Sequence, residues 1–343
     1  MADTKKEHYV PRCYLENFEG EKGKIQVFDK AILQIRPQTK ENIAAENYFY
    51  DIDFDKMMEG LDAESQQKVR SDIKEITGVE NWEEIAKNIL DKKHIEKSYF
   101  ATMEGVYAPF LKQIIAKSYG GNDWVIKHCK PFSEDEKIGL ALMMAIQMLR
   151  TKSHREEIGE MIAKTYQTLA YKMQMNDEDA LPKEAFEVEA NKDFVKLQHS
   201  AMFMDAEHIL GIAEALLNHI WVMRVNKTTT PFYTSDNPII RIPHKHDKFM
   251  SHSGLSSDGI EIAFPISPNL IVVLYERKWF SQYHGDLTFE IITSDKEVDY
   301  YNHGQVVHSY RCVYSQRDNF ELAQMLCEQN PQIREVGNRV SVG

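Results

Sequence analysis

The sequence contains few cysteines and none of the short motifs that most often mark a catalytic site. Its four cysteines, in a chain of 343 residues, include no pair with Cys-x-x-Cys spacing, which argues against a zinc finger and against a disulfide framework. The chain also lacks a glycine-rich phosphate loop, a His-Glu-x-x-His motif and a Gly-x-Ser-x-Gly elbow. The common signatures of nucleotide-binding proteins, zinc proteases and serine hydrolases are therefore missing.

Long apolar runs are missing as well. The longest, Ile138 to Leu149, is interrupted by Gln147 and is too short to cross a bilayer, and the charged start of the chain has no apolar stretch behind it. We therefore expect no membrane span and no signal peptide, and a cytoplasmic location. The net charge of −12 argues against broad nucleic-acid binding, although such a sum can hide a local basic pocket.

Hydrophobic periodicity divides the chain into parts. Residues 1–60 contain alternating segments typical of a small β element, residues 61–225 have helical periodicity, residues 226–315 return to strands, and residues 316–343 are predicted to be a tail. The expected fold class is α+β, with a central helical bundle, an N-terminal β element and a C-terminal antiparallel sheet. We expect these parts to form a single integrated domain over residues 1–343.

The same periodicity predicts individual elements. Helices are predicted over about 92–119, from Ser133 with its Ser-x-x-Glu capping box to about 175, over about 192–225, and near 295–307. Strands are predicted over 232–242, 260–266 and 270–276, the last two forming an antiparallel hairpin, and over 310–314 as an edge strand.

The predicted helices carry polar side chains on faces that are otherwise apolar. Positions three or four apart place Gln147, Arg150 and His154 in the middle of one apolar stripe. Glu104 interrupts a similar stripe on the preceding helix, and His199 heads one on a later helix. An unpaired charge on a buried face costs several kcal/mol, so each stripe implies a partner. The simplest arrangement is a contact between Glu104 and Arg150, with the histidines and Gln147 nearby.

Two interpretations of these polar groups stay open. In the first they form structural networks whose hydrogen bonds fix the register of the helices. In the second they line a pocket for a ligand, and Arg150 and Arg155 would suit a phosphate or a carboxylate. Several such interruptions on neighbouring helices favour the pocket more than any one of them does alone.

Two proline-containing segments also place polar residues among aromatic ones. The first is His8-Tyr9-Val10-Pro11-Arg12, and the second is Thr234-Ser235-Asp236-Asn237-Pro238. The structural alternative for Asp236 is a turn whose side chains bond their own backbone, although the flanking isoleucines and aromatics place that turn near the core. A structural role for His8 and Arg12 also stays open, because Pro11 argues against a helix that would align them.

The sequence resembles a known family. The resemblance rests on His8-Tyr9-Val10-Pro11-Arg12 with Tyr14, Leu15 and Phe18, on Gln147 with Arg150, on Thr234-Ser235-Asp236-Asn237-Pro238, and on Asn302 ahead of Arg311. These residues are similar to the motifs of the bacterial proteins of domain-of-unknown-function family 4238. The resemblance extends from about residue 7 to about residue 315. It implies one integrated unit and assigns no activity.

Two hypotheses of different classes follow. The first is an enzyme, a hydrolase acting on a phosphate ester or a nucleic acid, with His8, Glu104 and Asp236 as catalytic residues. Residues that would bind the anionic group are Arg12, Arg150, Gln147, His154, His199 and Asn302. A divalent metal ion is a candidate cofactor, with Glu104 and Asp236 as its candidate ligands. The second hypothesis is a non-catalytic module that binds a ligand or a protein partner and whose buried polar network is structural.

Overall fold

A computed structural model describes residues 6–59, 61–77, 81, 84, 95–119, 123–174, 182, 185–247 and 251–337. The elements of the first half are β1 (Lys6–His8), α1 (Arg12–Leu15), β2 (Ile25–Asp29), β3 (Gln34–Gln38), β4 (Ala45–Asn47), α2 (Phe54–Glu59), α3 (Ala63–Thr77), a π-helical turn η4 (Ile95–Phe100), α5 (Ala101–Tyr119), α6 (Asp123–His128), α7 (Glu134–Arg150) and α8 (Lys152–Gln174). Short 3-10 turns are η1 (Glu16–Phe18), η2 (Glu21–Gly23) and η3 (Lys40–Asn42).

The second half begins with two helices and continues with most of the strands. Its elements are α9 (Lys192–Met204), α10 (Ala206–Leu217), β5 (Ile220–Asn226), β6 (Thr234–Ser235), β7 (Ile240–Pro243), β8 (Ile260–Ser267), β9 (Leu270–Tyr275), α11 (Arg277–Phe280), β10 (Thr288–Ile292), α12 (Asp295–His308), β11 (Cys312–Ser315), α13 (Glu321–Gln329) and a 3-10 turn η6 (Pro331–Arg334). None of the helices in the described part of the chain combines the length and the apolar character that a bilayer crossing requires.

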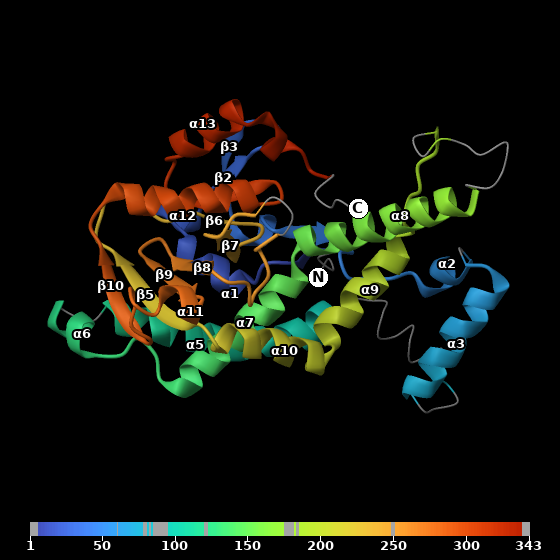
Figure 1. The fold of residues 1–343 in the computed structure, drawn as a ribbon, viewed down its shortest axis with the longest axis horizontal. Coiled ribbons are helices and arrows are strands. Elements are labelled where there is room, and N and C mark those ends of the chain that lie inside the picture. Colours follow the sequence, from blue (N-terminus) through green and yellow to red (C-terminus); the bar gives the residue numbers. More distant parts are fainter. Residues whose placement is uncertain are drawn as a thin grey trace.

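The described strands form one mixed and two antiparallel sheets. A five-stranded sheet has the order β10-β5-β9-β8-β7, in which only the β10–β5 pair is parallel. A four-stranded antiparallel sheet has the order β3-β2-β11-β6 and so combines the two ends of the chain. The third sheet is the ribbon β1–β4. The expected α+β class, with helices between an N-terminal β element and a C-terminal sheet, is confirmed (Figure 1).

The five-stranded sheet is apolar on both faces because helices pack against each of them (Figure 1). On β5, Trp221 and Met223 belong to a core cluster that includes residues of α7 and α10, whereas Val222 packs in a cluster with Tyr301 of α12. A strand that is buried on both faces has no polar alternation. The unbroken apolar run of β9, Leu-Ile-Val-Val-Leu-Tyr, follows from this arrangement.

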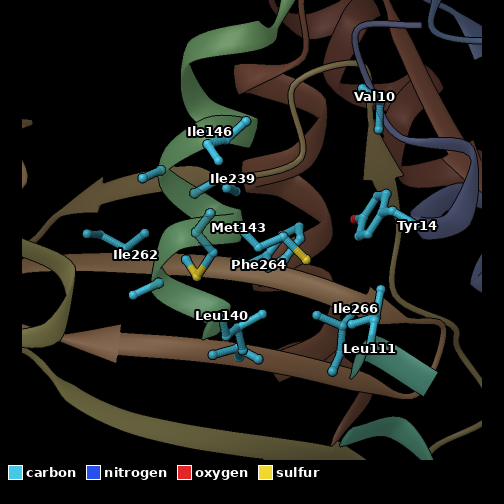
Figure 2. Packing of buried hydrophobic residues seen from close by; sticks show 14 of the residues in the cluster. Val10, Tyr14, Leu111, Leu140, Met143, Ile146, Ile239, Ile262, Phe264 and Ile266 are labelled. Carbon is cyan, nitrogen blue, oxygen red and sulfur yellow. The ribbon is translucent and has the colours of Figure 1, made fainter. Parts of the chain in front are cut away.

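Figure 2 shows the core between α7 and the strand β8. The apolar side chains of the two elements that meet there are Leu140, Met143 and Ile146 of α7, and Ile262, Phe264 and Ile266 of β8. The N-terminal segment reaches the same core through Tyr14, whose hydroxyl donates to the Pro265 carbonyl at 2.6 Å. Residues from the first, middle and last parts of the chain thus share one hydrophobic cluster.

Several sequence predictions of individual elements are confirmed. Ser133 and Glu136 form the predicted capping box at the start of α7. The hairpin β8–β9 is antiparallel, and α12 lies within one residue of its predicted bounds at the C-terminal end. Residues 92–94, where the helix over 92–119 was predicted to begin, lie outside the described residues, and the described part begins as the π-helical turn η4.

Other boundaries were wrong. The helix predicted from Ser133 to about 175 is two helices, since Thr151 adopts an extended conformation between α7 and α8. The helix predicted over 192–225 is α9, α10 and the strand β5, because Asp205 caps α10 by accepting from two of its backbone N–H groups and β5 is a buried strand without polar alternation.

The strand predicted over 232–242 is also divided. Its residues form β6 and β7, which belong to different sheets, because the Thr234–Pro238 segment turns between them. β11 lies between β2 and β6 and is therefore not the predicted edge strand. Within the predicted tail, α13 places Ala323 and Leu326 in a cluster with Phe28 and Val313, so residues 321–329 are packed rather than loose.

Candidate functional site

A cavity of about 560 Å³ lies beside the N-terminal ribbon. We call it the His8 pocket. Its walls come from β1, α1, the β3–β4 connection, η4 and α5, and the lining residues are Lys6, His8, Arg12, Glu41, Asn42, Asn47, Glu96, Lys97, Ala101 and Glu104. Three residues predicted from the sequence to act in the site, namely His8, Arg12 and Glu104, line this one cavity.

His8 is fixed in this pocket by Glu96. The Glu96 carboxylate accepts a hydrogen bond from the His8 backbone N–H at 3.3 Å, and the same oxygen lies 3.7 Å from Nδ1 of the imidazole. Burial would raise the pKa of Glu96, but the bonds from His8 and the charge of Arg150 outweigh it and hold that pKa below its ordinary value. The imidazole is therefore oriented by a carboxylate ion on its Nδ1 side.

The opposite nitrogen of His8 is unsatisfied. Nε2 is buried and has no hydrogen-bond partner among the described residues. Leaving a buried polar atom without a partner costs about 1–3 kcal/mol, and such atoms in folded proteins require an explanation. A carboxylate on one ring nitrogen and a free position on the other is the arrangement that general acid–base catalysis uses.

Arg150 supports His8 from behind the pocket. Its Nη2 donates to the His8 carbonyl at 2.6 Å, its Nη1 donates to Glu104 at 3.3 Å, and its guanidinium stacks on the Phe100 ring with 3.8 Å to the centroid. The predicted contact between Glu104 and Arg150 is thus present. With its side chain 3% exposed, Arg150 holds the His8 segment in place rather than facing solvent.

Two neighbours complete the support of this segment. Gln147 donates to the Tyr9 carbonyl at 3.2 Å, one turn before Arg150 on α7. Tyr50 donates its hydroxyl to the His8 carbonyl at 3.1 Å. The carbonyl oxygens of two consecutive residues are therefore held by side chains of α7 and of the segment after β4. Gln147 acts on the backbone of the N-terminal segment, as Arg150 does.

Asp236 lies outside the His8 pocket, and both of its carboxylate oxygens accept hydrogen bonds from the backbone. Its two oxygens accept from the backbone N–H groups of Tyr310, Arg311 and Cys312 at 2.7, 2.8 and 2.7 Å. Burial raises the pKa of Asp236 above its ordinary value, although these three bonds act against it. The carboxylate joins the β6–β7 turn to the start of β11. Its partners are backbone groups distant along the chain and not those of its own turn, on which the structural alternative for Asp236 was based.

The remainder of the Thr234–Pro238 segment is held by α12. Asn302 accepts from the Tyr233 backbone N–H at 2.7 Å and donates to the Pro231 carbonyl at 3.0 Å. One turn later, Gln305 accepts from the Ser235 hydroxyl and donates to the Pro238 carbonyl, both at 2.8 Å. Asn302 is thus engaged with the backbone outside the His8 pocket, since neither it nor its partners line that cavity.

The two predicted site histidines of the helices also lie elsewhere. Nε2 of His199 donates to the Leu149 carbonyl at 2.7 Å, and burial lowers the pKa of its imidazole to about 3. His154 lines a separate cavity of about 420 Å³, and burial lowers its pKa to about 4. Both imidazoles are therefore neutral at physiological pH, which suits packing near other buried groups better than anion binding.

Comparison with known proteins gives one match. The model of the family described as "Protein of unknown function (DUF4238)" matches residues 6–319, which is nearly the whole chain. The chain belongs to this family. No curated protein matches the sequence, and no solved structure matches it either. Membership of DUF4238 assigns no chemistry to the chain.

The DUF4238 chain does not bring its two metal-ligand candidates together. Glu104 lines the His8 pocket, whereas Asp236 is bonded to the start of β11. Within the described residues, no three or more His, Cys, Asp or Glu side chains are grouped so that they could hold a metal ion.

Glu96 was missed by the sequence analysis of this DUF4238 protein. It lies four residues before Phe100 and eight before Glu104, so a longer apolar stripe would have included it. That stripe was not continued by the one further turn that reaches Glu96, and helical periodicity by itself gives no reason to pair Glu96 with His8. In the structure Glu96 lies in the π-helical turn η4.

Proposed function

We propose that the His8 pocket binds a phosphate-bearing ligand and that the protein hydrolyses its phosphate ester, with His8 as the acid–base group. The observation that carries this proposal is the His8–Glu96 pair: a carboxylate lies beside Nδ1 while Nε2 has no partner among the described residues. Arg12 is exposed and lines the same cavity, where its guanidinium suits a phosphate oxygen.

Each group has a defined part in the proposed reaction. His8 accepts a proton from a water molecule as the water oxygen forms a bond to phosphorus, and the bond between phosphorus and the leaving oxygen breaks. The protonated imidazole then gives this proton to the leaving oxygen. Glu96 orients the ring and stabilises its positive charge, Arg12 binds the phosphate oxygens, and Arg150 is a positioning residue that acts through the His8 backbone.

Turnover of synthetic phosphate esters tests the proposal. Wild-type protein is incubated with p-nitrophenyl phosphate and bis-p-nitrophenyl phosphate, with added divalent metal or with a chelator. His8→Asn should lower kcat by at least about 100-fold, the usual contribution of a general acid–base group. Glu96→Gln should lower kcat less and shift the pH profile, because the charge that stabilises the imidazolium is lost.

His284→Asn is the matched control. Nδ1 of His284 lies 2.7 Å from Glu290, so this pair has the same chemistry outside the His8 pocket. The control should retain wild-type turnover. A His8→Asn protein that keeps every activity found in the wild type would overturn the catalytic assignment, and activity that requires added metal would show that His8 is not the sole activating group.

A second candidate function is a non-catalytic receptor for the same kind of ligand. It is favoured by the engagement of Arg150, Glu104 and Glu96 with one another, since such a network can serve stability alone. A thermal shift produced by nucleotides without metal, lost in Arg12→Gln and accompanied by no turnover, supports the receptor. A shift that is accompanied by His8-dependent turnover supports the enzyme.

A cytoplasmic location accompanies either function in this proposal. All four cysteines are free thiols, and Cys327 is buried among apolar side chains. Unpaired thiols are typical of proteins in a reducing compartment. Fractionation of cells that express the full chain tests the location, and recovery of the protein outside the cytoplasm would contradict it.

A further inference from the structure

A second cavity, of about 550 Å³, adjoins the His8 pocket. We call it the Arg36 pocket. It lies against one face of the four-stranded sheet, where the register Arg36–Val27–Tyr314 places side chains of β3, β2 and β11 in one row. Lys6 and Asn42 line both cavities, and Nζ of Lys6 donates to Oδ1 of Asn42 at 2.5 Å between them. The two pockets therefore share a wall formed by a cation and an amide.

Two arginines of this pocket are held by one buried carboxylate. Arg311 donates from Nε to both oxygens of Asp29 at 3.0 Å, with its Nη2 at 2.9 Å, and Nη2 of Arg36 lies 3.8 Å from the same group. Asp29 is fully buried, yet the side chains of Arg311 and Arg36 are 45% and 49% exposed. Asp29 thus orients two guanidinium groups and neutralises only one of them.

A second carboxylate of the pocket is shared in a similar way. The carboxylate of Glu46 is shared by Lys152 and Arg155, which lies 3.4 Å away, and the Lys152 ammonium lies 5.3 Å from the centre of the Tyr310 ring. The remaining carboxylate of the pocket, Asp236, already accepts three backbone N–H bonds. The oxygens of Asp236 are therefore bonded to backbone N–H groups, which partly offset its negative charge.

The local charge is opposite to that of the whole chain. Five cations, Lys6, Arg36, Lys152, Arg155 and Arg311, lie in or next to the Arg36 pocket with four carboxylates, Asp29, Glu46, Glu156 and Asp236. An excess of one positive charge is thus concentrated here in a chain whose net charge is −12. A local excess of positive charge attracts anions. It offsets the repulsion between the net negative charge of the protein and a chain of phosphates.

We infer that the Arg36 pocket is a second phosphate-binding subsite, so that the ligand of the His8 pocket carries at least two phosphate groups. Arg36 and Arg311 bind one phosphate, Lys6 bridges the shared wall, and Arg12 binds the phosphate next to His8. This inference rests on the proposed function for the identity of the first subsite. The ligand is a nucleoside polyphosphate or a short nucleic-acid strand, which share a chain of phosphates, and not a simple monoester.

Calorimetric titration of the full chain with inorganic phosphate, tripolyphosphate, ATP and a short thymidine oligonucleotide tests the inference. Tripolyphosphate should bind more tightly than inorganic phosphate, with an affinity that falls as salt is added. Arg36→Gln should weaken tripolyphosphate binding about tenfold, because it removes one charge-assisted contact. Lys152→Gln should weaken it less, since Arg155 still neutralises Glu46.

Arg241→Gln is the matched control, because Arg241 is exposed on β7 and lines neither pocket. Both test variants should remain folded: Arg36 is half exposed on an outer strand, and Asp29 keeps its bonds to Arg311. The relative affinities of ATP and the oligonucleotide then distinguish the two sources of the phosphate chain.

The outcomes separate this inference from the proposed function. If Arg36→Gln and Lys152→Gln bind tripolyphosphate as the Arg241→Gln control does, or if the wild type binds none of the four ligands, the second subsite is overturned. If binding depends on Arg36 but no ester is hydrolysed, the subsite stands and the catalytic proposal fails. If turnover depends on His8 while the binding of tripolyphosphate is insensitive to Arg36, the catalytic proposal stands and the subsite fails.

Discussion

The His8–Arg12 segment and the Thr234–Pro238 segment have the same character in the sequence, but their polar groups are used differently in the fold. In the second segment every oxygen of Asp236 faces backbone N–H groups, and Asn302 and Gln305 bond the backbone on either side. In the first segment the backbone carbonyls are held, while Nε2 of His8 is buried without a partner among the described residues. Both carboxylate oxygens of Asp236 thus have partners, whereas one ring nitrogen of His8 has none among the described residues.

This difference shows that burial of a polar group does not by itself indicate a binding site. Both Asp236 and His8 are buried, at 1% and 5% exposure, and both would be selected by a search for polar residues on apolar surfaces. Counting hydrogen-bond partners separates them, because a structural group is expected to be satisfied and a functional group keeps a free position for its ligand. If this distinction holds, substitutions at satisfied groups should cost more stability than the substitution of His8.

The largest expected effect is that of Asp236→Ala. The substitution leaves three buried N–H groups, those of Tyr310, Arg311 and Cys312, without an acceptor. We expect the free energy of unfolding to fall by about 4 kcal/mol, measured by urea denaturation. Asp258→Ala, at a carboxylate that is 45% exposed, should change it by less than about 1 kcal/mol. Equal effects of the two changes would show that the turn is not the structural element described here.

Arg150→Met should have the next largest effect. It removes the donor to the His8 carbonyl and leaves Glu104 and Glu96 without their buried cation, which should cost about 3 kcal/mol of stability in urea denaturation. The double variant with Glu104→Gln should recover part of this loss, since one unpaired carboxylate is then removed. Additive effects of the two changes would mean that Glu104 and Arg150 do not interact in solution.

Glu7→Gln should change how stability depends on pH. Burial, together with Asp51 and Glu96, raises the pKa of Glu7 from 4.5 to about 7, so the folded chain holds this proton more tightly than the unfolded chain. Stability should therefore fall as the pH rises from about 4.5 to about 7. The glutamine variant should lose this part of the dependence and be more stable at pH 8 by on the order of 1 kcal/mol. Parallel pH profiles for the variant and the wild type would contradict the shift.

The smallest effect on stability is expected for His8→Asn. Its Nε2 has no described partner to lose, and an amide at the same place can still face Glu96, so the free energy of unfolding should change by less than about 1 kcal/mol. His199→Asn is the comparison, because it removes the hydrogen bond between the imidazole and the Leu149 carbonyl. A loss at His8 as large as the loss at His199 would place both histidines among the structural groups.

Part of the fold and of the site could be predicted from the sequence. The capping box at Ser133, the hairpin β8–β9 and the contact between Glu104 and Arg150 follow from local patterns or from the need to pair a buried charge. The break at Thr151 could not, because residues 150–152 contain no glycine or proline. The separation of β6 from β7 could not either, because Pro238 indicates a turn but not that the strands on its two sides belong to different sheets. Glu96 lies one turn before the stripe that contains Glu104, and no local pattern shows that it meets His8.

The sequence by itself determined the α+β class, the alternation of apolar faces and the presence of polar groups that require partners, because these depend on residues close together along the chain. Only the tertiary structure decided which partners they have. Asp236 meets the backbone of residues 310–312 and Asp29 meets Arg311 across most of the chain length, and these contacts depend on how three sheets and the helices pack. The number of hydrogen-bond partners left for a ligand is therefore a property of the packed molecule and not of any motif.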